Sequence, residues 1–86
     1  MTTLDIHNKT ASEAQILVKG FIRERFELRD YNILIIHGFG QSIMRGVVWS
    51  ECEKNKLVDK YELAPPRLGG GGVTYIELKK KTWRTK

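Results

Sequence analysis

Two apolar patterns, one near the start and one near the middle of the chain, are those of strands. Residues 3–7 (TLDIH) alternate between apolar and polar side chains, which predicts a strand with one buried face. Residues 32–37 (NILIIH) form a continuous apolar run that ends in a histidine, and such a run is typical of a strand buried on both faces of a parallel sheet. We therefore expect the two strands to be parallel neighbours or near-neighbours.

Two other segments repeat apolar residues every three or four positions, as an amphipathic helix does. The first begins at Thr10, because Thr10 and Glu13 match a capping box, and it is predicted to end near Leu28. The second is predicted over about residues 41–55. The apolar positions that mark these helices are Ala14, Leu17, Val18, Phe21 and Ile22 on the core face of the first, and Ile43, Val47, Val48 and Cys52 in the second.

The last third of the chain has the pattern of two strands around a loop. Residues 57–64 and 73–79 predict strands, and residues 65–72 (PPRLGGGG) predict a loop because prolines and glycines do not continue a strand or a helix. The predicted order is βαβαββ. It corresponds to a two-layer α/β sandwich, with two helices on one face of a four-stranded mixed sheet and a right-handed first crossover.

The charge of the chain is concentrated at its C-terminus. The 86 residues include 15 basic and 10 acidic ones, and the last eight residues (KKKTWRTK) hold five of the basic ones, so the body is neutral. Such a tail either lies on phosphates with Trp83 stacked on a base, or is a solvated end that keeps the domain soluble. We predict that residues 80–86 are mostly disordered without a ligand.

Composition excludes a membrane role. No apolar run approaches the roughly 18 residues of a membrane span, and no basic segment followed by an apolar one marks a signal peptide. The single cysteine, Cys52, cannot form an internal disulfide, and its helical position favours a buried apolar role over a nucleophile. We expect a cytoplasmic protein with no membrane partner.

The candidate chemistry gathers where the first two strands end. If those strands are parallel, His7 and His37 lie at the same carboxyl edge of the sheet, which is where open α/β sheets bind ligands. The turn at residues 38–40 (GFG) then leads into a helix N-terminus, which favours an anion such as phosphate. A plain tight turn and a hydrogen-bonded edge histidine are the simpler alternatives. Phe39 either stacks on a base or sugar or folds back onto the core.

The surroundings of this edge are basic. Residues 31–50 and 63–76 contain no acid, and Lys9, Arg45 and Arg67 belong to segments near these turns. A phosphate-bearing ligand suits such a site, in which Asp5 is the one carboxylate.

Several short motifs resemble one known family. Residues 4–7 (LDIH) resemble the Leu-Asp-x-His motif that opens the Smr (small MutS-related) domain, and residues 37–40 (HGFG) resemble its His-Gly-x-Gly turn. Arg45 falls where that family has Leu-Arg in the following helix. Residues 64–66 (APP) and 69–74 (GGGGVT) are similar to its Ala-Pro and Gly-Gly-x-Gly-x-Thr segments.

The resemblance spans about residues 3–80. It implies a fold like the C-terminal domain of bacterial initiation factor three, and nucleic-acid binding with nicking endonuclease activity in many members. The domain occurs alone, and at the C-terminus of a MutS paralogue that suppresses recombination and acts on stalled or collided ribosomes. The expected partners are therefore DNA, RNA or the ribosome, and the expected parent is a larger multidomain protein. We divide the chain into an Smr domain at residues 1–79 and a basic tail at residues 80–86.

The first hypothesis is a nicking endonuclease without sequence specificity. His7 would be the general base, because the pKa of an imidazole lies near neutral, and Asp5 would orient it or hold Mg²⁺ or Mn²⁺. One carboxylate is a poor cage for Mg²⁺, and RNA cleavage through the 2′-hydroxyl needs no metal. The residues assigned to phosphate or nucleic-acid binding are Lys9, His37, Gly38, Phe39, Gly40, Arg45, Arg67, Gly70 and Gly72.

The alternative hypothesis is a non-catalytic module that holds DNA, RNA or a ribosome through the same basic edge and tail. A third is a protein-interaction domain, which a lack of salt-dependent nucleic-acid binding would favour.

Overall fold

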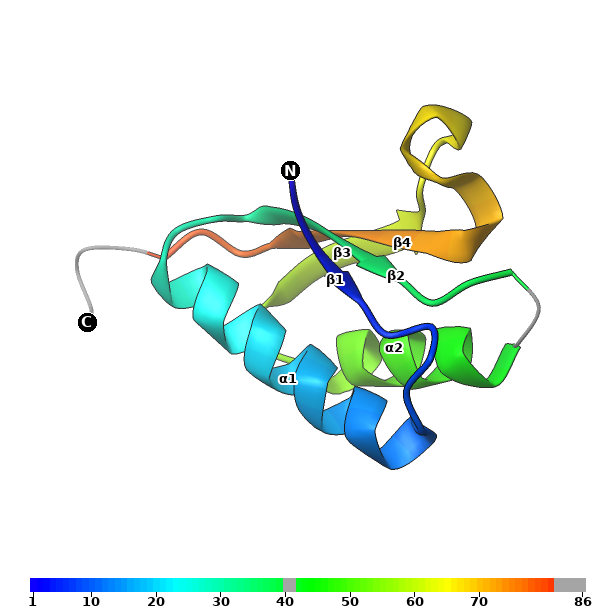
Figure 1. Cartoon of the computed structure of the whole chain (residues 1–86). Helices are drawn as coiled ribbons and strands as arrows, with labels where there is room; N and C mark the ends of the chain where they lie inside the picture. Colours follow the sequence, from blue (N-terminus) through cyan, green and yellow to red (C-terminus); the bar gives the residue numbers. More distant parts are fainter. Residues whose placement is uncertain (40–41, 82–86) are drawn as a thin grey trace.

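The chain forms one four-stranded sheet with two helices on one face (Figure 1). The computed structural model describes residues 1–39 and 42–81. The strands pair in the order β1-β2-β4-β3, with β1 and β2 parallel and the other pairs antiparallel. The predicted βαβαββ sandwich is confirmed. The elements are β1 (Thr2–Asp5), α1 (Ala11–Glu27), β2 (Asn32–Ile36), α2 (Ser42–Lys54), β3 (Val58–Leu63), the 3₁₀ turns η1 (Pro66–Leu68) and η2 (Gly70–Gly72), and β4 (Val73–Leu78).

Strand β2 is buried on both faces, as its continuous apolar run predicts. Ile33 and Ile35 are fully buried in the core cluster between the sheet and the helices. Leu34 lies on the other face, in a second cluster with Ala64 and Val73. The predicted loop therefore carries a packing role, because Leu68 of η1 packs against this second cluster and covers part of the face that has no helices.

Helix α1 begins with the predicted capping box. The Thr10 Oγ1 accepts a hydrogen bond from the Glu13 amide at 3.1 Å, and a Glu13 carboxylate oxygen accepts one from the Thr10 amide at 3.0 Å. The buried positions of the helix are Ala14, Val18 and Ile22, spaced four residues apart. Leu17 was predicted to face the core but is 38% exposed, because the helix buries a narrower stripe than the apolar pattern indicates.

Helix α2 buries a stripe displaced by one residue from the predicted start. Met44, Val48 and Cys52 are buried against the sheet, whereas Ile43 is 64% exposed. Apolar residues occupy the adjacent positions 43 and 44 and again 47 and 48, so the sequence alone does not fix which row faces inward. Neither helix in the described part of the chain is long and apolar enough to cross a membrane.

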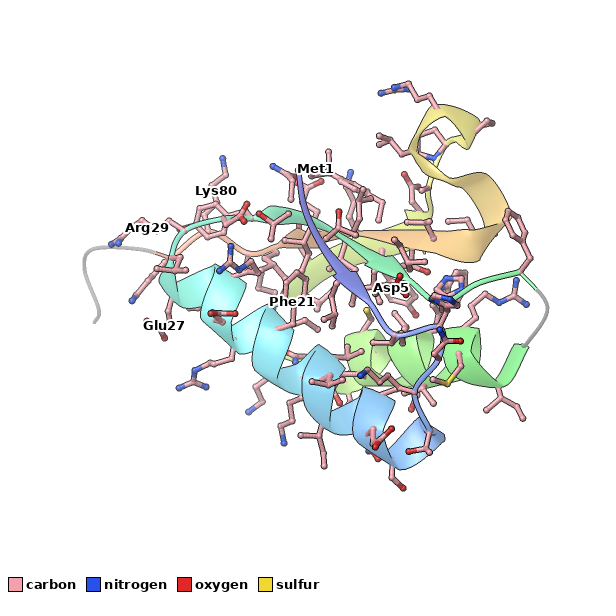
Figure 2. All side chains as sticks on the ribbon, in the orientation of Figure 1. Met1, Asp5, Phe21, Glu27, Arg29 and Lys80 are labelled. Carbon is pink, nitrogen blue, oxygen red and sulfur yellow. The ribbon has the colours of Figure 1, made fainter. Side chains whose placement is uncertain are left out.

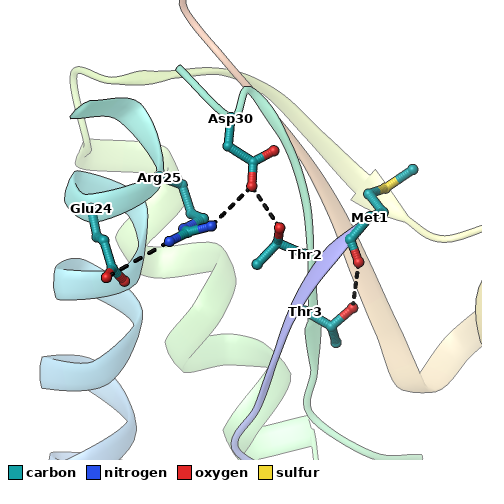
Figure 3. Close-up of polar contacts among 6 residues, drawn as sticks. All are labelled: Met1, Thr2, Thr3, Glu24, Arg25 and Asp30. Atoms are coloured by element: carbon teal, nitrogen blue, oxygen red, sulfur yellow. Dashed lines mark hydrogen bonds and ion pairs between the residues drawn. The ribbon is translucent and has the colours of Figure 1, made fainter. Parts of the chain in front are cut away.

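The start of β1 is fastened to the end of α1 by a small polar cluster (Figure 3). Asp30 Oδ2 accepts hydrogen bonds from the Thr2 hydroxyl at 2.6 Å and from Arg25 Nη1 at 3.1 Å. Arg25 also pairs with Glu24 at 3.7 Å, and the Thr3 hydroxyl donates to the Met1 carbonyl at 3.3 Å. These contacts hold the edge strand at one end, so that its other end is placed firmly beside β2.

The basic tail starts at the end of the sheet away from Asp5. Figure 2 shows Asp5 on one side of the molecule and Glu27, Arg29 and Lys80 on the other. Lys81 contacts the body of the domain there, since its Nζ donates to Glu27 at 2.6 Å and its amide donates to the Tyr31 hydroxyl at 2.9 Å. Residues 82–86, with Trp83, lie outside the described residues, so the disorder of residues 80–86 stays a prediction.

Candidate active site

The two histidines lie at the same edge of the sheet, as predicted. The parallel strands β1 and β2 are in register with Asp5 opposite Ile36, and the Ile6 amide donates to the Ile36 carbonyl at 2.9 Å. His37 follows β2 directly, and His7 follows β1 after Ile6. Their segments are close, since a Cβ built on Gly38 would lie 3.5 Å from the Cβ of His7.

Asp5 and His7 form a half-exposed acid–imidazole pair. The His7 Nδ1 lies 2.5 Å from Asp5 Oδ1, which also accepts the His7 amide at 3.0 Å, and each side chain is 49% exposed. These hydrogen bonds from His7, first the side chain and then the backbone, hold the pKa of the Asp5 carboxyl below its usual value, and the charges of His7 and Lys9 add to this.

The ionised Asp5 fixes the tautomer of the neutral imidazole. A carboxylate can only accept, so the Nδ1 of His7 carries a hydrogen, and in the neutral imidazole the lone pair is on Nε2. Within the described residues, Nε2 has no hydrogen-bond partner. The pair therefore presents an oriented basic nitrogen to solvent, which is what a general base requires.

His37 is an interior residue. Its side chain is 2% exposed, and its Nε2 lies 2.8 Å from the Thr74 hydroxyl, which also receives the Trp49 indole N–H at 2.9 Å. The Nδ1 lies 3.2 Å from the Gly38 carbonyl, which can only accept. The hydrogen bonds therefore run from Trp49 to Thr74, from Thr74 to His37, and from His37 to Gly38.

This network keeps His37 neutral and away from a ligand. Burial is the main cause that lowers the pKa of His37, and the nearby Arg45 charge lowers it further, against the opposing effect of the Gly38 hydrogen bond. Both ring nitrogens have partners in the protein. The predicted contact between His37 and a phosphate is therefore replaced by a structural role, that of holding the turn against β4.

Backbone amides of the two glycine-containing turns donate hydrogen bonds to carbonyls within these turns and the loop beside them. The amides of His37 and Gly38 both donate to the Gly72 carbonyl at 3.0 Å, and the Gly70 amide donates to Pro65 at 3.1 Å. These amides already have partners within the protein, and the predicted phosphate contacts of Gly38, Gly70 and Gly72 stay predictions. Gly38 serves the turn itself, since its φ of +87° favours glycine. Gly40 lies outside the described residues.

Phe39 does not fold back onto the core. Its side chain is 79% exposed. The ring lies beside the backbone of the η2 turn, because a Cβ built on Gly72 would come within 3.0 Å of two ring carbons. Of the two predicted roles of Phe39, only the outward-facing one agrees with the structure.

Arg45 and Lys9 supply positive charge at this edge of the sheet. Arg45 lies in the first half of α2, is exposed, and has its Cζ 6.0 Å from the centroid of the Trp49 ring. Its charge acts on His37, and that of Lys9 acts on Asp5. Arg67 belongs to η1, which projects from the sheet on the side away from the helices (Figure 1). No contact joins Arg67 to the Asp5–His7 pair in the described part of the chain.

The donor atoms at this edge do not form a cage for a metal. Among the described residues, no three His, Cys, Asp or Glu side chains gather in a group that could hold an ion. Asp5 is a single carboxylate, and its Oδ1 already accepts two hydrogen bonds from His7. The reaction proposed for this site therefore has no step that involves Mg²⁺ or Mn²⁺.

Trp49 and Thr74 are part of the site but were not singled out by the sequence. Thr74 lies in the GGGGVT segment, where its place in a motif was the available signal. Trp49 follows Arg45 by one helical turn. This spacing places the Arg45 guanidinium over the Trp49 ring, and the spacing was the available signal in the sequence. Both act by fixing His37 and the turn.

Comparison with known proteins gives relatives of one kind. The family model described as the Smr domain matches residues 4–79. Endonuclease MutS2 of Thermotoga petrophila is 36% identical over 78 residues, and that of Lactococcus lactis is 30% identical over 76 residues. These alignments cover 91% and 88% of this chain but 10% of each relative. The chain thus spans about a tenth of the length of these curated relatives.

Solved structures agree with the family. The crystal structure of the Smr domain of Thermus thermophilus MutS2 superposes with a TM-score of 0.88 at 28% identity, covering 92% of this chain and 99% of that one. YdaL, a stand-alone small MutS-related protein from Escherichia coli, superposes with a TM-score of 0.87 at 29% identity, covering 92% and 65%. The match over residues 4–79, the shared fold and the placement of the LDIH and HGFG motifs at one sheet edge show that this chain belongs to the Smr domain family.

Proposed function

We propose that this domain nicks phosphodiester bonds in DNA or RNA without sequence specificity, in the suppression of recombination or in the quality control of ribosomes. The observation that carries the proposal is the Asp5–His7 pair with its free Nε2, at a sheet edge where the charge of Lys9 acts on Asp5 and that of Arg45 acts on His37. The name of the relatives, Endonuclease MutS2, agrees with this chemistry.

The pair supplies the proton transfer of the cut. His7 Nε2 takes the proton of a water molecule, or of the 2′-hydroxyl in RNA, as that oxygen attacks phosphorus. The ester bond to the leaving oxygen breaks, and that oxygen takes a proton from solvent. Asp5 stabilises the imidazolium that forms, because its ionised carboxylate accepts from the protonated Nδ1.

Cationic side chains stabilise the negative charge on the phosphoryl oxygens in the transition state. Arg45 can bind two phosphoryl oxygens in parallel, and Lys9 adds a point charge next to Asp5. The amides of His37 and Gly38 take no part, since the Gly72 carbonyl occupies them.

A nicking assay tests the proposal. Supercoiled plasmid and a structured RNA are each incubated with the wild-type chain, with His7→Ala and with Asp5→Asn, in Mg²⁺, Mn²⁺ or chelator. Asn8→Ala is the matched control, because Asn8 is the exposed neighbour of His7. We expect cutting by the wild type and by the control, and cutting that is slower by about 10² to 10⁴-fold in His7→Ala. A His7→Ala chain that cuts at the wild-type rate contradicts the mechanism.

One observation favours the alternative of a binding module. A leaving oxygen is protonated best by a second titratable group, and His37 is buried and held by Thr74 and Gly38. In the described part of the chain, His7 is thus the one exposed histidine at this edge. Salt-dependent binding to DNA, RNA or ribosomes, without cutting under any of the three conditions, would favour the module.

A further inference from the structure

Phe39 is a large apolar side chain that the fold leaves in solvent. Its 79% exposure is the highest among the large apolar residues of the described chain. Phe39 follows Gly38, whose amide donates to the Gly72 carbonyl at 3.0 Å, so the backbone just before the ring is held beside η2. An aromatic ring that is exposed to this extent points to a binding role, because burial of the ring would stabilise the chain.

The ring rests on a surface that only glycine provides. A Cβ built on Gly72 would lie 3.0 Å from the Cδ2 and Cε2 of Phe39, and one built on Gly71 would lie 3.4 Å from Cε1. Carbons on both sides of the ring are therefore close to the two glycines. We infer that one face of the ring covers this glycine backbone while the other face is open.

The segments that carry the ring and its support suit a nucleotide. Phe39 belongs to residues 31–50 and the two glycines to residues 63–76, and neither segment contains an acid. Arg45 is near enough for its charge to lower the pKa of His37, two residues before Phe39. A ligand with a flat aromatic part and an anionic part fits both features, and a nucleotide has both.

We propose that the Phe39 ring, supported by Gly71 and Gly72, is a stacking platform for one nucleobase of the substrate. This inference rests on the proposed function and specifies its substrate class. In a duplex the faces of a base are covered by its neighbours, so a base reaches this platform only when it is unpaired or extruded. The substrate is therefore a nucleic acid with an unpaired nucleotide next to the cut, such as a single strand, a loop or a flap.

Binding measurements with three variants test the platform. Phe39→Ala removes the ring, Phe39→Leu keeps an apolar side chain without a π-face, and Phe39→Trp keeps a larger ring. The probes are a fluorescent 12-nucleotide single strand, the same length of blunt duplex, and a single strand in which abasic residues replace every base. Dissociation constants come from fluorescence anisotropy, and thermal unfolding checks that each variant folds.

The platform predicts a loss that depends on the base. Phe39→Ala and Phe39→Leu should weaken binding of the base-bearing strand by about 5- to 150-fold, as expected for one base–aromatic stack, and Phe39→Trp should not. Binding of the abasic strand and the duplex should not change. Equal binding by Phe39→Leu and the wild type, or an equal loss on the abasic strand, would overturn the platform, as would a wild type that does not bind the base-bearing strand.

The same variants separate this inference from the proposed function. If His7→Ala slows cutting while the Phe39 variants bind as the wild type does, the endonuclease stands and the platform is wrong. If Phe39→Leu loses base-dependent binding and the wild type cuts nothing, the platform stands and the endonuclease is wrong.

Discussion

His7 and His37 occupy corresponding positions after neighbouring strands, but His7 is exposed to solvent and His37 is buried. Each follows one of two parallel strands that are neighbours in the sheet, and each is preceded by an isoleucine. His7 follows the edge strand β1, so its ring lies half in solvent against the ionised Asp5. His37 follows β2, which lies between β1 and β4, so its ring is covered and hydrogen-bonded to Thr74 of β4.

The difference teaches that strand position decides the chemistry of a residue as much as its type does. An edge strand leaves its last side chains to solvent, where an imidazole can exchange a proton. A strand with neighbours on both sides brings a third element over the ring, where an imidazole must stay neutral and partnered. The following predictions separate the two histidines by experiment, from the largest expected effect to the smallest.

The largest effect is expected from removing the exposed histidine. His7→Ala should lower the rate of nicking by about 10² to 10⁴-fold, the range typical of a lost general base. Its free energy of unfolding should change by less than about 0.5 kcal/mol, because an exposed side chain carries little stability. Nicking rates and urea unfolding, measured on the same sample, check both parts. A His7→Ala chain that is strongly destabilised would remove the contrast with His37.

The second prediction disrupts the buried histidine through its partner. Thr74 is fully buried, and its hydroxyl joins Trp49 to His37. Thr74→Val keeps the shape but leaves the indole N–H and the His37 Nε2 without this partner, so we expect a loss of about 2–4 kcal/mol in unfolding free energy. Thr74→Ser keeps the hydroxyl and is the control, with a smaller loss expected. Equal urea midpoints for Thr74→Val and the wild type would show that the network does not stabilise the turn.

The third prediction concerns Arg45, whose charge reaches the His37 side of the site. Arg45→Ala should weaken binding of a nucleic acid by roughly 1–3 kcal/mol, the loss typical of a hydrogen bond to a charged group. The slope of log affinity against log salt should fall by about one phosphate contact. Arg45→Lys, which keeps the charge but not the fork, should fall between Arg45→Ala and the wild type. An unchanged salt slope, or a chain that unfolds, would make Arg45 a structural partner of Trp49.

Much of the fold could be predicted from the sequence because each element carries its own periodic signal. Two of these signals are local patterns, namely the capping box at Thr10 and the buried apolar run of β2. The parallel pairing of β1 and β2 depends on a single crossover between them. In α2 the predicted Val48 and Cys52 are buried, but the first inward residue is Met44 and not Ile43, because both of these are apolar. A local pattern cannot choose between two adjacent apolar rows.

The position of the candidate site at the sheet edge could be predicted from the sequence, but the burial of His37 could not. Asp5 ends β1 and His7 lies two residues later, a spacing that in extended chain places both side chains on one face, and the two are hydrogen-bonded. The burial of His37 depends on Thr74, 37 residues later, and the loss of its backbone amide depends on Gly72. The HGFG segment itself contains no signal of these long-range partners, and its pattern alone therefore predicted a site for a phosphate.

The smallest effect is expected in the dependence of stability on pH. Burial lowers the pKa of His37 in the folded chain below the value of 6.5 taken for an unperturbed histidine. Below that value the unfolded chain binds a proton at this site that the folded chain does not. The free energy of unfolding should therefore decrease as pH falls through 6.5, and this contribution is fully present only above it.

The window from pH 7.5 to 5.5 isolates this contribution. The carboxyls whose pKa values are lowered by the fold, such as Asp5 and Asp30, start from an ordinary value of 3.8 and lose their contribution only at lower pH. One proton sets an upper limit of about 1.4 kcal/mol per pH unit on the slope. The slope should be present in the wild type and in His7→Gln, and absent in His37→Gln. NMR titration of the wild-type imidazoles is the second measurement, because it does not require His37→Gln to fold. The His37 ring should titrate below the ordinary value of 6.5, and titration at or above that value would contradict the effect of burial.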